Sequence, residues 1–219
     1  MMTGMRVLIV IAAWGLLALV GTRMWPDAGA AASGSHELSA EQRAATLTFA
    51  PEVAQKDRAW VLAAIGRARP EAQRLISEID GLVEIRTDLP RGDAIGLARM
   101  SMDEAIVSFD VRSLNGDRAI DRNVAVLHEF GHIIDFTLVS DELIQQLDQG
   151  IPRLGECTDP GGHTGTCTAV EERFAETFAK WALRGRISLA GSGYGIPAPA
   201  SIEDWGAPLG LLAARLNAR

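Results

Sequence analysis

The residues best suited to chemistry follow one another as His128-Glu129-Phe130-Gly131-His132. On a helix, His128 and His132 lie one turn apart on the same face, where two imidazoles can bind one tetrahedral Zn²⁺. Glu129 lies beside that face and can reach a water molecule in the open fourth position. Zinc lowers the pKa of such a water towards about 7, and a nearby carboxylate then accepts its proton. The spacing predicts a zinc hydrolase centre; the alternative is two core histidines and a salt-bridging glutamate.

A two-histidine zinc site needs a third protein ligand, and a second stretch of the chain offers one. Glu172 and Glu176 are four residues apart, so a helix presents both on one face, with the small Ala175 and Ala179 beside them. Small residues allow that face to lie close to another helix. This argues against the alternative of a solvated run of charges. By position alone, either glutamate can be the ligand.

Together the two stretches resemble the gluzincin metalloproteases, and in particular the catalytic domain of the anthrax lethal factor family. The resemblance covers residues 121–183. It implies that Glu172 is the third zinc ligand and that Glu176 contacts a ligand histidine from outside the coordination sphere. Outer carboxylates of this kind fix the tautomer of a ligand imidazole. Asp135, on the histidine face of the first helix, is a second candidate for that outer role.

The chain departs from this family at one position. The family has a tyrosine several residues before its ligand glutamate, where it faces the developing oxyanion, whereas this chain has Gly165 in that region. The only tyrosine of the chain is Tyr194. His163 and Tyr194 are therefore the candidates for stabilising the oxyanion. The alternative is that each is an ordinary loop residue.

The chain has two cysteines, Cys157 and Cys167. In an exported protein, two cysteines are most simply explained by one disulfide. The alternative is a metal site of cysteine and histidine, which needs a reducing compartment and further ligands. Cys167 directly precedes Thr168, which with Glu171 forms a capping box that is expected to start the second helix. The disulfide is thus expected to hold the start of the helix that carries Glu172.

Residues 1–32 have the features of an export signal. Arg6 and the terminal amine precede an unbroken apolar run at residues 7–20, which is short for a membrane span and suits a signal-peptide core. Small residues that suit cleavage follow this run. One alternative is an uncleaved membrane anchor through residues 7–25. The other is a buried N-terminal core helix, against which the positive flank and the missing amphipathic period argue.

After a short Gly/Ser linker, residues 39–219 are predicted to form a single α+β domain. Asp121 can cap a helix over Arg122–Leu138 that carries the histidine motif and is apolar around most of its circumference. Gly131 lies on its histidine face, where a missing side chain would leave room around a metal ion. We expect further helices at residues 56–68, 70–79, 141–149 and 209–217, and strands at residues 82–87, 95–100 and 105–111. The resemblance implies that these form a zincin-like fold with a small mixed sheet around the central motif helix.

The net charge of −7 and the pI near 5.1 argue against a nucleic-acid-binding protein. We predict an exported or membrane-anchored zinc-dependent peptidase in which Glu129 is the general base and then the proton donor to the leaving amine. By resemblance to zincins, the strand at residues 105–111 is expected to be the sheet edge along which an extended peptide substrate pairs. Two other functions stay open, namely a non-catalytic zinc-stabilised binding module of the cell envelope and a zinc hydrolase of a non-peptide amide.

Overall fold

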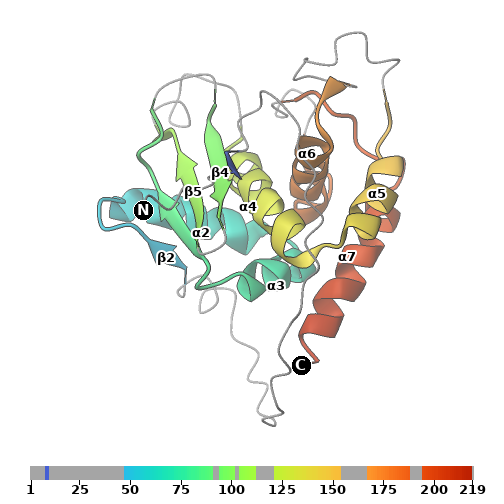
Figure 1. Ribbon diagram of the computed structural model, residues 1–219, viewed down its shortest axis with the longest axis horizontal. Helices are drawn as coiled ribbons and strands as arrows, with labels where there is room; N and C mark the ends of the chain where they lie inside the picture. The colour runs from blue at the N-terminus through green and yellow to red at the C-terminus, as the bar shows by residue number, and fades with distance from the viewer. Residues whose placement is uncertain are drawn as a thin grey trace, which may run out of the picture.

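The computed structural model describes residues 8–9, 47–90, 94–101, 104–111, 121–153, 167–187 and 194–218 of the 219-residue chain. It has a mixed α+β architecture, as the sequence predicts, with the sheet beside α2 and α4 and with α5, α6 and α7 farther from it (Figure 1). The described strands are β1 (Leu8–Ile9), β2 (Thr48–Phe49), β3 (Val83–Arg86), β4 (Gly96–Met100) and β5 (Ala105–Phe109). The described helices are α2 (Gln55–Arg67), α3 (Pro70–Glu78), α4 (Arg122–Leu138), α5 (Asp141–Gln149), α6 (Val170–Ala182) and α7 (Ile202–Leu216).

The described strands form one mixed sheet in the order β1-β4-β5-β3-β2. β3 runs parallel to both β5 and β2, whereas β4 runs antiparallel to β5. β5 thus lies between two neighbours, and four of its five residues are buried. The prediction that this strand is the sheet edge open to a peptide is therefore wrong, because a buried apolar strand belongs in the interior of a sheet. The outer position on that side belongs to the two-residue strand β1, which pairs with Arg99 and Met100 of β4.

α4 is the central helix of the described fold, and every residue from Val124 to Ile134 is buried. It begins where the sequence predicts, since the carboxylate of Asp121 accepts a hydrogen bond of 2.8 Å from the backbone N–H of Asn123. The helix packs against the sheet through β4 and β5 and against α2 and α6 on its other sides. A helix surrounded in this way has to be apolar around most of its circumference.

α4 and α6 approach each other closely at Gly131. A Cβ atom at this position would lie 2.9 Å from Cα of Ala175 on α6. The missing side chain therefore makes room for the backbone of α6 rather than for a metal ion. Ala175 and Ala179 are fully buried at this interface region, as expected for the small residues beside the two glutamates.

Two predicted helix starts are wrong. α6 begins at Val170 with Ala169 as its N-cap and no side-chain capping bond, so the capping box of Thr168 does not form, and Thr168 is instead buried. α7 begins at Ile202, seven positions before its predicted start at residue 209. The hydroxyl of Ser201 caps it by accepting a hydrogen bond of 3.1 Å from the N–H of Asp204. Packing and this cap outweigh the low helix propensity of the glycine and proline that follow.

The N-terminal segment expected to be an export signal contributes β1, in which Leu8 pairs with Met100 and Ile9 with Arg99. The rest of residues 1–32, and the linker that follows, lie outside the described residues. Export, cleavage and anchoring through residues 7–25 stay predictions. Within the part of the chain that the structure describes, no helix is both long and apolar enough to span a bilayer.

Candidate metal centre

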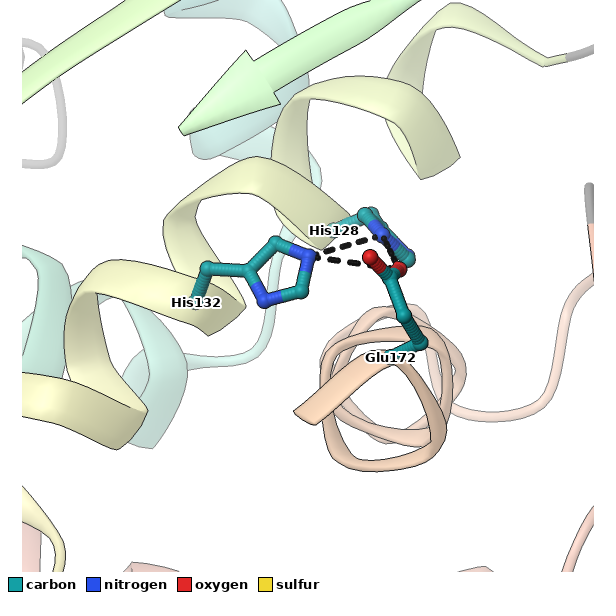
Figure 2. Close-up of side chains that lie close together, drawn as sticks. All are labelled: His128, His132 and Glu172. Carbon is teal, nitrogen blue, oxygen red and sulfur yellow. Dashed lines mark hydrogen bonds and ion pairs between the residues drawn. The ribbon is translucent and has the colours of Figure 1, made fainter. Parts of the chain in front are cut away.

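His128 and His132 lie one turn apart on α4, and Glu172 reaches them from α6 (Figure 2). The Nε2 atoms of the two histidines are 3.1 Å apart. Oε2 of Glu172 lies 3.0 Å from Nε2 of His128 and 3.4 Å from Nε2 of His132. All three side chains are buried. This group could hold a metal ion, because one ligand atom from each residue lies within 4.8 Å of the others.

The protonation of this group is set by its own hydrogen bonds. Burial disfavours a charged imidazole, but hydrogen bonds with Glu172 and Glu176 outweigh burial and raise the pKa of His128 to about 10. Burial also opposes ionisation of Glu172, yet its hydrogen bonds with His128 and His132 outweigh that effect and hold its pKa well below the ordinary value. Glu172 is therefore a carboxylate at neutral pH, and a metal ion that binds His128 has to displace a proton.

The two candidates for an outer carboxylate differ in their contacts. Oε2 of Glu176 lies 3.5 Å from Nδ1 of His128, and Glu176 is almost fully buried. Asp135 is only partly buried, and no hydrogen bond or ion pair joins it to His128 or His132 among the described residues. Burial raises the pKa of Asp135 to about 6, against the opposing charge of His132. Glu176 is thus the carboxylate that contacts a histidine of the centre.

Glu129 lies between the histidines and strand β4. Its side chain is buried and accepts a hydrogen bond from the backbone of Ala98. Burial raises the pKa of Glu129, and the nearby His128 and His132 oppose this shift. Gly96 faces the same carboxylate, and a Cβ atom there would come within 3.0 Å of Oε1. Glycine at this position of β4 therefore makes room for Glu129.

Tyr194 lies at the centre, although it follows α6 in the chain. Its ring stacks on the ring of His128, with 5.4 Å between the centroids and an angle of 10° between the planes. It also makes a hydrogen bond with Glu172. The other candidate oxyanion stabiliser, His163, lies outside the described residues. The structure thus brings one of the two candidates to the histidines.

Cys167 is disulfide-bonded, close to the start of α6. Its expected partner, Cys157, lies outside the described residues, so the pairing of these two positions stays a prediction.

Sequence reasoning missed two residues that contact the centre's side chains. Gly96 makes room for Glu129, and the ammonium group of Lys180 lies 3.2 Å from Oε1 of Glu176. A glycine within a strand is a signal of close approach by another group. The spacing of four residues between Glu176 and Lys180 places them side by side on a helix. Both signals are present in the sequence, but the glycine does not identify Glu129 as its neighbour, and the helix spacing does not identify Ile196 as the second partner of Lys180.

Comparisons of the chain with models of protein families, with curated proteins and with solved structures find no match.

Proposed function

We propose that this protein is a zinc-dependent metallopeptidase with a zincin-like fold. The observation that carries the proposal is the convergence of His128, His132 and Glu172 from two helices, with Glu129 buried beside them. Structural zinc sites are usually closed by four protein ligands, whereas catalytic sites have three and keep one position for water or substrate. The part of the chain that the structure describes supplies three. This number supports a catalytic centre.

The donor atoms and their spacing suit zinc. Two imidazole nitrogens and one carboxylate oxygen are a ligand set of catalytic zinc sites. Two atoms bound at about 2.05 Å to one tetrahedral ion are about 3.3 Å apart. The three donor atoms of His128, His132 and Glu172 are 3.0, 3.1 and 3.4 Å from one another. These side chains would therefore hold the ion without rearrangement of α4 or α6.

When bound, zinc would supply a Lewis acid that acidifies a water molecule and polarises the scissile carbonyl. Glu129 would accept the proton from this water and donate it to the leaving amine. Tyr194 would donate a hydrogen bond to the developing oxyanion. Burial and the charge of Glu172 raise the pKa of the Tyr194 phenol, so the hydroxyl of Tyr194 keeps its proton at neutral pH. Glu176 would hold the ring of His128 in place through Nδ1.

The substrate would be an extended peptide that pairs with β4 on the side away from β5, beyond the two residues that β1 covers. This strand lies next to the proposed base, since Gly96 faces the carboxylate of Glu129. Further along β4, Arg99 and Met100 already pair antiparallel with Leu8 and Ile9. This side of β4 thus already accepts an extended segment. Removal of the N-terminal segment would leave the same backbone groups of β4 free to pair with a peptide substrate.

We place this activity outside the cytoplasm, with residues 1–32 as a cleaved signal or residues 7–25 as an anchor. The disulfide at Cys167 supports this location, because disulfides persist in oxidising compartments.

The proposal is tested with a mixed peptide library, with and without a chelator, using the wild-type protein and Glu129→Gln. The wild type is expected to contain one zinc ion per chain and to cleave peptides, and the chelator should abolish cleavage. Glu129→Gln should keep the zinc and lose at least about 10²-fold in rate, since only the proton acceptor is removed.

Three other results would each change the conclusion. A purified protein without zinc would overturn the proposed centre. A zinc-loaded protein that cleaves no peptide would favour either the binding module or the hydrolase of a non-peptide amide. Near wild-type cleavage by Glu129→Gln would exclude this residue as the base.

A further inference from the structure

A buried lysine lies behind the metal centre. Lys180 is on α6, one turn after Glu176 and two turns after Glu172, and its side chain is only 3% exposed. Its ammonium group lies 3.2 Å from Oε1 of Glu176 and donates a hydrogen bond to the carbonyl oxygen of Ile196. A buried ammonium group needs polar partners of this kind. Lys180 therefore ties the helix to the segment at residues 194–196.

Lys180 contacts Glu176 and the backbone of Ile196. Glu176 contacts the edge of the His128 ring, and the segment of Ile196 carries Tyr194, which covers the face of that ring. The second oxygen of Glu176, Oε2, lies 3.5 Å from Nδ1 on the edge of the imidazole. Ile196 is two residues after Tyr194, and the ring of Tyr194 stacks on the face of the imidazole. Gly195 between them has φ 64°, a left-handed conformation that favours glycine. One ammonium group is thus linked to both contacts of the ligand ring.

We propose that Lys180 is a positioning residue that fixes His128 and Tyr194 relative to each other. The inference rests on the proposed function for the roles of these two residues. The cation holds the carboxylate that orients the imidazole, and it holds the backbone that carries the tyrosine over the same imidazole. Removal of the ammonium group would release both at once.

Lys180→Met tests this inference, because methionine is apolar and has nearly the same length. Tyr194 is the only tyrosine of the chain, so 3-fluorotyrosine labels one site and gives one ¹⁹F resonance. In Lys180→Met this resonance is expected to move towards the position of exposed fluorotyrosine. In cobalt-loaded protein the visible spectrum of the metal should change as well. The ¹⁹F measurement is made on metal-free protein, prepared with a chelator, and needs no hydrolysis. It therefore distinguishes failure of this inference from failure of the proposed function.

Arg173→Met is the matched control. Arg173 is also a buried cation of α6, but it donates hydrogen bonds to Asp148 at 2.7 Å and to the carbonyl oxygen of Ile151 at 3.1 Å. Its loss should leave the ¹⁹F resonance and the cobalt spectrum as in the wild type. An unchanged resonance and spectrum in Lys180→Met would overturn the inference. Equal changes in both variants would also overturn it, since they would follow from loss of any buried cation.

A second pair of variants keeps the test decisive if Lys180→Met does not fold because the charge of Glu176 is left unpaired. Glu176→Gln keeps the contact between Lys180 and Ile196, so it should alter the cobalt spectrum and leave the ¹⁹F resonance in place. The double variant Glu176→Gln with Lys180→Met removes both charges and should move the resonance. The same ¹⁹F position in the single and the double variant would overturn the inference.

Discussion

His128 is contacted by a different carboxylate at each of its two ring nitrogens. Its Nε2 lies 3.0 Å from Glu172, and its Nδ1 lies 3.5 Å from Glu176. Of these two nitrogens, Nε2 is the one that lies close to Nε2 of His132. A ligand imidazole binds metal through one nitrogen and donates from the other. The geometry therefore supports Glu172 as the ligand and Glu176 as the outer partner.

We expect Glu172→Ala to lose zinc and Glu176→Ala to keep it with about 10–100-fold weaker affinity. The first change removes one of three protein bonds to the ion, whereas the second only frees the ring that makes one of them. Competition with a chromophoric chelator measures both affinities. Glu171→Ala, at an exposed position of the same helix, is the control and should bind as the wild type does. The reverse order of the two affinities would exchange the assigned roles.

The protonation of His128 predicts how zinc affinity depends on pH. Because the pKa of His128 is raised to about 10, the imidazole of His128 is protonated at neutral pH in the metal-free protein. Zinc has to displace it, and a lower pH strengthens the competing proton. Zinc affinity should therefore rise about tenfold for each pH unit between about pH 6 and pH 8. Titration at several pH values measures this slope, and an affinity independent of pH would contradict the raised pKa.

At this scale the sequence predicts which residues meet, because helix periodicity brings His128 beside His132 and Glu172 beside Glu176. It does not predict Lys180 or Gly96 as parts of the centre. Their roles depend on which segment lies opposite, the backbone of Ile196 in one case and the side chain of Glu129 in the other. Local patterns do not identify these tertiary partners.

Among the elements, the crossing of α4 and α6 sets the distance between the two halves of the centre. Gly131→Ala would place a methyl group 2.9 Å from the backbone of Ala175, which cannot move as a side chain can. We expect a loss of about 1–3 kcal/mol in the free energy of unfolding, together with weaker zinc binding. Denaturant unfolding and zinc titration measure the two effects.

Gly66→Ala on α2 is the matched control, because nothing lies within 4 Å of the Cβ position there. It should stabilise the protein by about 0.4–1 kcal/mol through helix propensity and a less flexible unfolded chain. Equal stability of the two alanine variants would mean that the helices have room to separate.

Strand β4 provides a test of how Glu129 is positioned. Gly96→Ala would displace the carboxylate of Glu129 while leaving His128, His132 and Glu172 untouched. We expect zinc to remain bound and the hydrolysis rate to fall by about 10²-fold, since a displacement of about 1 Å from the productive geometry has an effect of this size. Elemental analysis and the peptide assay are read together. Full activity in this variant would mean that the base adapts to the added methyl group.

The elements also show where local patterns predict structure well and where they do not. α4 and α5 occupy the residues that the sequence predicts, 122–138 and 141–149. α7 begins earlier than its composition suggests, because Gly206 lies against Trp181 and the packing outweighs helix propensity. The place of β5 inside the sheet depends on the order of strands, which a single strand's pattern does not contain.

For the whole molecule, α4 connects two parts of different architecture. It packs against the sheet on one side and against α6 on another (Figure 1). The candidate ligands lie where α4 meets α6, whereas Glu129 faces β4. The α+β class follows from the sequence, since strands and helices are predicted in separate runs. The site lies between the two parts because one helix carries residues that face both.

The crossing of α4 and α6 has a consequence for the rates of folding and unfolding. His128 and Glu172 are 44 residues apart in the chain, and contacts of large sequence separation are slow to form because a long loop has to close first. We expect the three ligands to meet only after the rate-limiting step of folding. Zinc should then slow unfolding by nearly the whole factor by which it stabilises the protein and leave the refolding rate unchanged. Stopped-flow experiments with zinc and with a chelator measure both rates. Faster refolding in zinc would mean that α4 and α6 already contact each other in the transition state of folding. The lifetime of the folded protein would thus be governed by how long it retains its metal.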